Sequence, residues 1–364
     1  MPSSSSTAKR SAAKQSPADD IREIDALFTQ AGLVRSLRGK SSARFRAERL
    51  DRAAPEELVR TAPKPHVAKN GARWLPVPGW VFSWLWSGFS TRLGGLSRAY
   101  CADDAQGELN LGFTAADDRE AVTANRRLLA EAVAGDAATS LITLRQFHSN
   151  LVVRVTAADA TRERPWKADG VITDESGLLL AVQTADCIPV LLADRRRKAV
   201  GAFHAGWRGT VKRIVETGVG RMRFEFGSRP EDLVAAIGPG IGQCCYAVGE
   251  EVLSEFESQF TYGRELFREV YDSDAVRTKY PMLFLTQRAP GHSPIGPSLH
   301  ADLTEANRRQ LMAAGVGEKK IQIVGGCTQC QPELFYSHRG SRGHAGRMMA
   351  VIGVDPKNRP ASER

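Results

Sequence analysis

The sequence predicts a mixed α/β or α+β domain built on an extended sheet core. Three observations carry this prediction. Strand-like and helix-like segments alternate from about residue 80 onward. The 364 residues are enough for one large domain with an appendage, or for two domains. Hydrophobic residues make up 42% and charged residues 25% of the chain, which is ordinary globular composition and excludes collagen, coiled coil and wholesale disorder.

The first elements follow from composition and from a helix start signal. The aromatic run at residues 80–86 predicts the opening strand of the domain. Asp117 and Asp118 precede a segment in which Val122, Leu128 and Leu129 share one side, so a helix is expected there. Short apolar runs predict strands at residues 141–144 and 151–155.

The second half repeats the alternation. Apolar runs predict strands, and spaced apolar positions predict helices. Strands are expected at 178–182, 188–192, 199–203, 235–237 and 321–324, and helices from about 210 through 215, at 248–260 and at 304–314. Residues 261–298 are rich in Pro and turn residues, and we expect a long insertion there.

The basic charge of the chain is concentrated at its beginning. Residues 1–80 hold 15 Lys and Arg against 8 Asp and Glu, whereas the remaining 284 hold 35 against 33. We therefore expect a basic N-terminal extension and linker (1–80), a disordered end at 1–20 with a helical arm at about 20–58, a catalytic domain (81–353) and a tail (354–364). Nucleic-acid binding is not expected of the main domain.

The sequence also predicts the compartment. The most apolar stretch, residues 178–192, is interrupted by polar residues and cannot span a bilayer, and no apolar signal core follows Met1. The six cysteines are too sparse for a disulfide scaffold and are expected to be reduced. Together these features indicate a cytoplasmic protein that does not interact with membranes.

Four polar residues stand at predicted strand ends or strand-to-turn corners: Arg92, His148, Cys187 and His204. Two imidazoles and one thiolate suit a zinc site with an open fourth position, which would lower the pKa of a bound water. The same trio suits a cysteine nucleophile with a histidine base. Hydrogen-bonded structural histidines and a buried apolar cysteine are the third interpretation, and spacing alone does not decide among them.

Other candidates have simpler interpretations. Arg92, beside two glycines, suits a phosphate, although a turn arginine paired with an acid is the more common arrangement. The glycines at 238–242 lack the form of a dinucleotide site. Cys327 and Cys330 lack a second C-x-x-C pair for a zinc ribbon, so structural thiols are expected. Trp207 and Tyr246 could stack on a base, although packing is the default role.

Taken together, these segments resemble the laccase-domain or "polyphenol oxidase" family, also called YfiH-type, whose members are understood as purine nucleoside phosphorylases. The most specific matches are Thr184-Ala-Asp-Cys187 and His204-Ala-Gly-Trp-Arg-Gly209. Matches in the same order cover about residues 81–353: 89–97, 109–112, Asn125-Arg126, 146–149, Asp169-Gly170, 237–242, 244–246, Asp302-Leu303, Asn307, Cys327-Thr328 and 346–348.

The resemblance implies a layered α-β-β-α sandwich similar to cysteine-hydrolase toxins. It implies that His148, Cys187 and His204 form the metal site, usually with zinc and with copper as the alternative, and that Arg92 lies in the same pocket. Two departures from the family pattern are Ala247, where an acid is common, and the length of residues 261–298.

The function implied is phosphorolysis of adenosine, inosine, guanosine or methylthioadenosine to the base and ribose 1-phosphate, with adenosine deamination as a side activity. Arg92 would hold phosphate, and Asp186 and Asn110 are the polar candidates for protonating the departing base or binding substrate. The alternatives are an amidase that edits a cell-wall precursor, a binding module that acts through the basic arm, and a polyphenol oxidase. Seven histidines without a His-x-His pair argue against several coppers.

Overall fold

The computed structural model describes residues 64–101, 106–270 and 298–358. The predicted disordered end, the predicted helical arm and most of the predicted insertion lie outside these residues. Within them the chain forms two six-stranded sheets and one three-stranded sheet.

The first large sheet has the order β1-β2-β3-β16-β8-β5. Its neighbours are antiparallel except for the parallel pair β5–β8. Its strands are β1 (His66–Val67), β2 (Arg73–Leu75), β3 (Leu85–Ser90), β16 (Met348–Val354), β8 (Leu178–Thr184) and β5 (Ser140–Ile142). The sheet thus joins the beginning, middle and end of the domain, and β16 lies at its centre.

The second large sheet has the order β15-β11-β9-β10-β7-β6. β9, β10, β7 and β11 pair antiparallel, whereas the outer pairs β11–β15 and β6–β7 are parallel. Its strands are β15 (Ile321–Ile323), β11 (Leu233–Ile237), β9 (Ile188–Asp194), β10 (Val200–Ala205), β7 (Gly170–Thr173) and β6 (Val152–Arg154). The three-stranded sheet contains β12 (Ala247–Val248), β14 (Ser298–Ala301) and β13 (Phe267–Val270), and β4 (Leu93–Ser97) follows β3 along the chain.

Alternation along β8 shows how the layers form. Leu178, Leu180 and Val182 pack into the core shared by the two sheets, whereas Leu179 and Ala181 pack on the other face, against Leu129 and Ala130 of α2 (Arg119–Ala134). Successive strand residues point to opposite faces, so a run buried on both faces must lie inside a layered structure. Asp118 caps α2 by accepting a hydrogen bond from the Ala121 amide, as the sequence predicts.

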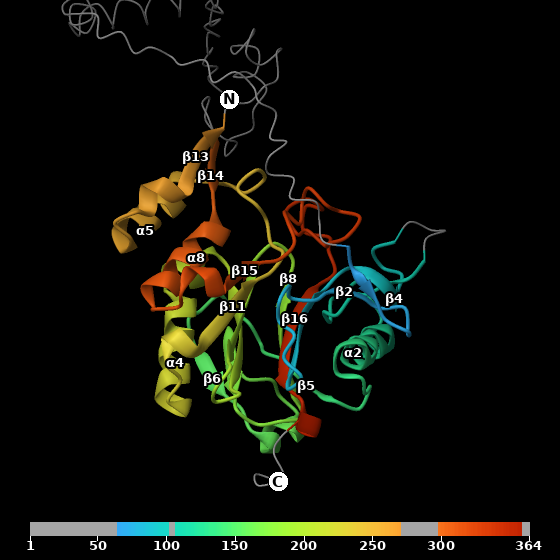
Figure 1. The fold of residues 1–364 in the computed structure, drawn as a ribbon. Helices are drawn as coiled ribbons and strands as arrows, with labels where there is room; N and C mark the ends of the chain where they lie inside the picture. Colours follow the sequence, from blue (N-terminus) through green and yellow to red (C-terminus); the bar gives the residue numbers. More distant parts are fainter. Residues whose placement is uncertain (1–63, 102–105, 271–297, 359–364) are drawn as a thin grey trace, which may run out of the picture. The chain divides into compact units, whose positions relative to one another are not determined.

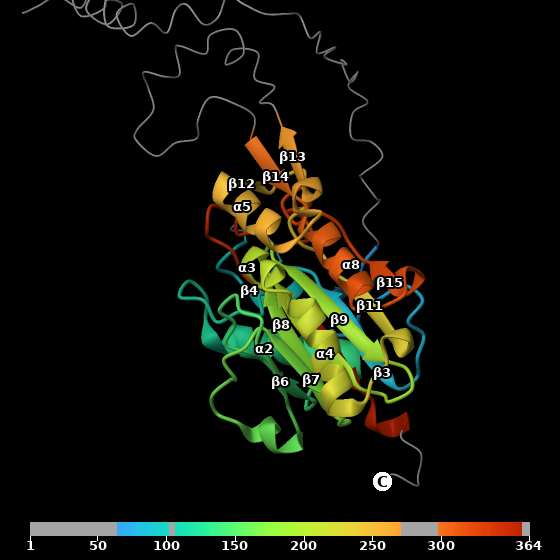
Figure 2. The same cartoon turned by 90° about the vertical axis from the view of Figure 1, so that its left-hand side faces the viewer.

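β9 separates its residues in the same way. Leu191 and Ala193 face the first sheet, whereas Val190 and Leu192 face a helical layer. That layer contains α3 (Trp207–Val211), α4 (Ile214–Phe226), α5 (Glu250–Gln259) and α8 (Leu303–Ala313). Figure 1 shows the two sheets between α2 and these helices, and Figure 2 shows α4 and α8 across the second sheet. The predicted α-β-β-α sandwich is confirmed. Five short 3-10 helices complete the described elements: η3 (Ala157–Thr161), η4 (Pro230–Asp232), η5 (Gly263–Leu266), η6 (Glu318–Lys320) and η7 (Pro356–Asn358).

Several predicted boundaries need correction. The aromatic run at 80–86 is not a strand over its whole length, because β3 begins only at Leu85 and Trp80 and Phe82 pack as loop side chains against the core. β1 and β2 lie in the segment predicted to be a linker, yet they belong to the first sheet. The sequence analysis predicts neither β7 nor β16. The helix expected near 210 is two helices, separated by Lys212 and a left-handed Arg213.

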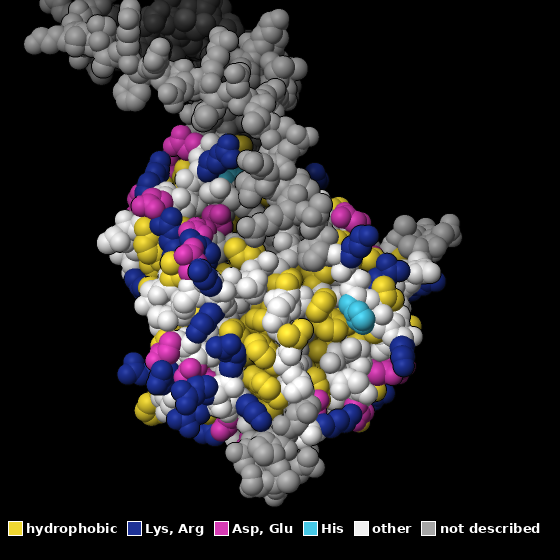
Figure 3. All heavy atoms as spheres, in the orientation of Figure 1, with side chains coloured by type: hydrophobic (Ala, Val, Ile, Leu, Met, Phe, Trp, Pro, Cys, Tyr) yellow, Lys and Arg dark blue, Asp and Glu magenta, His cyan; other side chains and the backbone are white. Residues whose placement is uncertain are grey.

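The helical surface carries mixed charge. Arg308 and Arg309 on α8 both pair with Glu305, and Arg309 also reaches Glu265. Figure 3 shows basic and acidic side chains interspersed over α4 and α8, with hydrophobic side chains exposed in the middle of this face. Among the described residues, none of the helices combines the length and hydrophobicity needed to cross a bilayer.

Candidate active site

Strand pairing brings His148, Cys187 and His204 to one edge of the second sheet. His204 lies in β10, and Cys187 comes directly before β9, which pairs antiparallel with β10 so that Ala205 faces Ile188. His148 lies between β5 and β6 along the chain, and in the sheet β7 lies between β6 and β10. Strand ends that meet at one edge of a sheet place polar side chains together.

The three ligand atoms form a compact group. All lie within 4.8 Å of one another, and the Cys187 sulfur is 3.8 Å from Nε2 of His148. The two imidazole centroids are 5.0 Å apart at an interplanar angle of 68°. His204 is buried, Cys187 is half-buried and His148 is exposed, so the group is closed on the sheet side and accessible from the His148 side.

A carboxylate behind the trio orients His204. Oδ1 of Asp169 is 2.9 Å from Nδ1 of His204, and the carboxylate is fully buried. This contact leaves Nε2 of His204 as the nitrogen available for a metal, since a histidine ligand commonly donates its other N–H to a carboxylate. Sequence reasoning missed Asp169 as a site residue, although Asp169-Gly170 stands among the matched motifs.

The same carboxylate shapes the His148 loop. The backbone amides of Phe147, His148 and Ser149 and the Ser149 hydroxyl all donate hydrogen bonds to Asp169. His148 has a positive φ of 63°, a conformation that a non-glycine residue adopts only when its surroundings enforce it. Asp169 therefore positions one candidate ligand through its backbone and another through its ring.

Gly206 leaves the space that the side chains of His148 and Cys187 occupy. A Cβ added at Gly206 would lie 2.8 Å from Cδ2 of His148 and 2.9 Å from the Cys187 sulfur. Gly206 precedes α3 with an ordinary negative φ, so space rather than backbone freedom is what this position requires.

The electrostatics favour a thiolate beside an imidazolium. Burial acts to raise the pKa of Cys187, but His204 and His148 outweigh it and lower that pKa to about 6. Burial acts to lower the pKa of His204, but the Cys187 thiolate and Asp169 outweigh it and raise that pKa to about 9. Hydrogen bonds from His204 and Ser149 keep the pKa of Asp169 far below its usual range, despite burial. Near neutral pH the metal-free chain therefore carries a thiolate at Cys187.

Asp186 precedes Cys187, and its carboxylate accepts hydrogen bonds from two loops. Its Oδ1 accepts a 2.7 Å hydrogen bond from the Thr328 hydroxyl, and its Oδ2 accepts a 2.6 Å hydrogen bond from the Arg339 amide. Asp186 is buried and has a positive φ of 92°. A carboxylate that accepts on both oxygens is a poor proton donor, so this geometry favours a positioning role over the predicted acid.

Arg92 and Asn110 are also engaged in protein contacts. Nη2 of Arg92 is 2.6 Å from Oε1 of Glu108, and its Nη1 donates to the carbonyl of Pro332. Asn110 is fully buried, and its amide bonds the backbone of Gly112 and Arg347. Among the described contacts of Arg92 and Asn110, none reaches the trio. Their predicted roles in binding phosphate and substrate stay predictions.

Two cations not singled out by sequence reasoning, Arg208 and Arg339, act electrostatically on Tyr246, as Cys187 does. The pKa of Tyr246 rises to about 12, chiefly through burial and the Cys187 charge, while Arg339 and Arg208 act against the rise. The Arg339 guanidinium carbon is 5.3 Å from the centroid of the Tyr246 ring, and both arginines are exposed. The Trp-Arg dipeptide within the His204–Gly209 motif was the available signal for Arg208.

Comparison with known proteins identifies the family. The model of the multi-copper polyphenol oxidoreductase laccase family matches residues 86–355. The chain belongs to this family. The resemblance inferred from the sequence is thereby confirmed.

Relatives in this laccase family carry a more specific name. The chain is 35% identical over 299 residues to a purine nucleoside phosphorylase, YlmD, of Geobacillus stearothermophilus, covering 79% of this chain and 97% of the relative. It is 38% identical over 267 residues to a purine nucleoside phosphorylase of Deinococcus radiodurans, covering 73% and 88%.

Solved structures agree with the fold. The crystal structure of Bacillus licheniformis YfiH superposes with a TM-score of 0.64 at 29% identity, covering 80% of this chain and 99% of that one. The crystal structure of YlmD from Geobacillus stearothermophilus superposes with a TM-score of 0.62 at 33% identity, covering 80% and 100%.

The trio suits a metal ion. Two imidazoles and a thiolate are donors that zinc and copper both accept, the atoms lie close enough for one ion, and Asp169 supplies the supporting hydrogen bond. His148, Cys187 and His204 are therefore a possible metal-binding group whose exposed side leaves room for a substrate.

Proposed function

We propose that this chain is a purine nucleoside phosphorylase that uses a zinc ion held by His148, Cys187 and His204. The observation that carries the proposal is the trio with Asp169 behind it, in a chain that covers 88–97% of two relatives bearing that name. The substrates proposed are adenosine, inosine, guanosine and methylthioadenosine. In this reaction an oxygen of phosphate bonds to the ribose C1′ as the bond from C1′ to the purine nitrogen breaks.

The protein residues supply the orientation. When bound, zinc would act as a Lewis acid that polarises a reacting oxygen. His148 and Cys187, the more accessible ligands, face the substrate side, while Asp169 fixes the ring of His204. Asp186 holds the loops that contain Thr328 and Arg339 against this side.

Two exposed arginines are the proposed phosphate-binding residues. Arg208 and Arg339 are exposed, and both act electrostatically on Tyr246, as Cys187 does. We assign phosphate binding to these two arginines, with Arg92 as the further candidate from the sequence. Arg92 would first have to release its ion pair with Glu108, whereas Arg339 would release a hydrogen bond from Nη1 to the neutral carbonyl of Ala247.

Two aromatic side chains are the proposed contacts for the purine base. Phe147 is 40% exposed directly beside His148, and Tyr246 is half-buried near Cys187. With a pKa of about 12, the Tyr246 phenol keeps its proton at neutral pH and can donate a hydrogen bond to the departing base. We assign stacking of the purine to Phe147 and this hydrogen bond to Tyr246.

Adenosine deamination is proposed as the accompanying activity. It requires water instead of phosphate as the nucleophile, with C6 of adenine placed at the trio instead of C1′ of ribose. A histidine and cysteine zinc site of this type supports that reaction in other deaminases. Inosine and ammonia are the products that distinguish it from phosphorolysis.

The test uses the purified full chain with adenosine, in the presence and absence of phosphate. Adenine and ribose 1-phosphate should appear only when phosphate is present, and Cys187→Ala should abolish both. Cys101→Ala is the matched control, because Cys101 lies in neither cysteine-containing cluster. Phosphate-independent release of free ribose would instead identify a nucleosidase, and full activity of Cys187→Ala would refute the site.

A further inference from the structure

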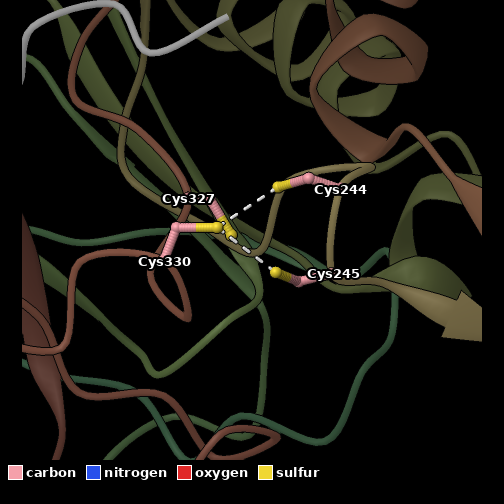
Figure 4. Close-up of side chains that lie close together, drawn as sticks. All are labelled: Cys244, Cys245, Cys327 and Cys330. Atoms are coloured by element: carbon pink, nitrogen blue, oxygen red, sulfur yellow. Dashed lines mark hydrogen bonds between the residues drawn. The ribbon is translucent and has the colours of Figure 1, made fainter. Parts of the chain in front are cut away.

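A second group of metal-type side chains lies outside the proposed active site. Cys244, Cys245, Cys327 and Cys330 converge from two loops, and Figure 4 shows their sulfur atoms directed toward one another. These are four of the six cysteines of the chain, and the proposed reaction uses none of them. We call this group the four-cysteine cluster.

The sheet topology explains how the two pairs meet. β11 and β15 are parallel neighbours in the second sheet, with Ile237 opposite Ile323, so the loops after them leave from the same edge. The pairing continues beyond the strands through a bridge between Gly240 and Cys327 and a 2.9 Å hydrogen bond from the Thr328 amide to the Gly240 carbonyl. The convergence is thus part of the fold.

The sulfur positions match a tetrahedron better than disulfides. All four sulfurs lie within 4.8 Å of one another, with Cys330 3.5 Å from Cys244 and 3.3 Å from Cys245. Zinc–sulfur bonds of about 2.3 Å in a tetrahedron place sulfurs about 3.8 Å apart, whereas a disulfide requires about 2.05 Å. All four cysteines are free thiols in the structure.

Adjacent cysteines can serve one ion here because they lie in a turn. The amides of Cys245 and Tyr246 both donate to the Gly242 carbonyl, which closes the loop tightly. In a strand, successive side chains would point to opposite faces. Figure 4 shows Cys244 and Cys245 both directed toward Cys327 and Cys330.

Backbone amides surround one sulfur of this cluster. The amides of Gly242, Cys330 and Gln329 donate hydrogen bonds to the Cys327 sulfur. Amide donors around a ligand sulfur are the supporting interactions expected of a metal site. Gly242 also lets the loop approach, since a Cβ there would lie 3.1 Å from Cβ of Cys327.

The donor set selects the metal. Four sulfur ligands favour zinc or another thiophilic ion over magnesium or calcium, which require oxygen ligands. A complete set of four cysteines leaves no position for substrate and is typical of structural zinc.

We propose that Cys244, Cys245, Cys327 and Cys330 bind a zinc ion through four sulfur ligands, forming a structural centre separate from the His148, Cys187 and His204 site. The centre fixes the two loops that contact the active site: Ile241 donates its amide to the Asp186 carbonyl, Thr328 bonds the Asp186 side chain, and Tyr246 follows Cys245 directly. The proposal does not depend on which reaction the active site performs.

The test removes the first site and asks whether zinc remains. The full-length Cys187→Ala protein, purified under reducing conditions, should contain about one zinc ion per chain by elemental analysis. Its zinc X-ray absorption should show only sulfur neighbours at about 2.3 Å. Cys187→Ala/Cys330→Ser should lose this zinc, whereas Cys187→Ala/Cys101→Ser, the matched control, should retain it.

Several results would overturn the proposal. These are a folded Cys187→Ala protein without zinc, nitrogen or oxygen neighbours in its absorption spectrum, or disulfides among the four cysteines in the reductant-purified chain. The readout needs only Cys187→Ala, so it holds even where Cys330→Ser does not fold. Metal content and activity are measured separately, so failure of this proposal is distinguishable from failure of the proposed phosphorylase activity.

Discussion

The two cysteine-containing clusters of this molecule differ in completeness. The trio combines one thiolate with two imidazoles and is supported by the buried carboxylate of Asp169. The four-cysteine cluster contains sulfur donors only, from two loops that pair through Gly240 and Cys327. Open sites with three protein ligands are typical of catalysis, and closed sites with four are typical of structure. The contrast supports both proposals, that the reaction takes place at the trio and that the four-cysteine cluster stabilises the two loops.

The largest expected effect is a difference in catalytic activity between a variant of the trio and a variant of the four-cysteine cluster. Cys187→Ala should lower kcat/KM by about 10³-fold or more, because metal catalysis supplies several kcal/mol and each 1.4 kcal/mol is a factor of ten. Cys330→Ser should lower the melting temperature but reduce kcat/KM less than about tenfold at a temperature where it stays folded. Phosphorolysis kinetics and thermal unfolding measure both. Equal losses of activity in the two variants would contradict the division of roles.

Replacing the carboxylate behind His204 should weaken only the trio. Asp169→Asn is expected to reduce metal affinity at this site by about 10–100-fold, since it removes the negative partner of the His204 ring. Competition with a chromophoric chelator measures the affinity. Asp174→Asn is the control, because Asp174 pairs with Arg154 on the surface. Metal loss from the four-cysteine cluster in Asp169→Asn would show that the two sites are not independent.

Gly206 offers a steric test of the trio. Gly206→Ala should destabilise the fold by about 1–3 kcal/mol and weaken metal binding, because the new methyl group would crowd His148 and Cys187. Gly220→Ala is the matched control. Gly220 lies in α4 with nothing within 4 Å of its Cβ position, so alanine there should be neutral or stabilise by up to about 1 kcal/mol. Denaturant unfolding distinguishes the two, and a harmless Gly206→Ala would contradict the packing argument.

The smallest expected effect is in thiol reactivity. In the metal-stripped chain, Cys187 should be alkylated by iodoacetamide with a half-maximal rate near pH 6, since its thiolate is lost as the pH falls through that value. Burial raises the pKa of Cys101, so its rate should still be increasing above pH 9. At pH 7 the advantage of Cys187 is only about a few-fold, because a less basic thiolate is a weaker nucleophile. Peptide mass spectrometry resolves the two sites, and a Cys187 midpoint near pH 9 would contradict the ion pair.

Much of the second sheet could be predicted from the sequence because its strands are continuous apolar runs. β9 and β10 matched their predicted segments within about two residues at each end. β16 is equally apolar, but its central place in the first sheet depends on β3 and β8, which lie far away along the chain. The aromatic run at 80–86 predicts too long a strand, because large aromatic side chains can also pack against a core from a loop.

The candidate site shows the same limit. Motifs singled out His148, Cys187 and His204, but only the parallel pairing of β6 and β7 and the β7–β10 register reveal that Asp169 supports two of them. Cys327 and Cys330 have no second C-x-x-C pair in the sequence, but in the structure another cysteine pair lies beside them. Cys244 and Cys245 supply that pair from more than 80 residues earlier, without a C-x-x-C spacing. Contacts set by sheet register leave no local pattern in a sequence.

The three residues between β8 and β9 carry a further consequence. β8 belongs to one sheet and β9 to the other, and Cys187 lies in this short crossover while His204 lies within the second sheet. Sliding of one sheet over the other would therefore pull the thiolate away from the imidazole. Metal affinity at the trio should therefore depend on how tightly the two sheets pack. A cavity between the sheets, as in Leu180→Ala, should lower this affinity even while the protein stays folded.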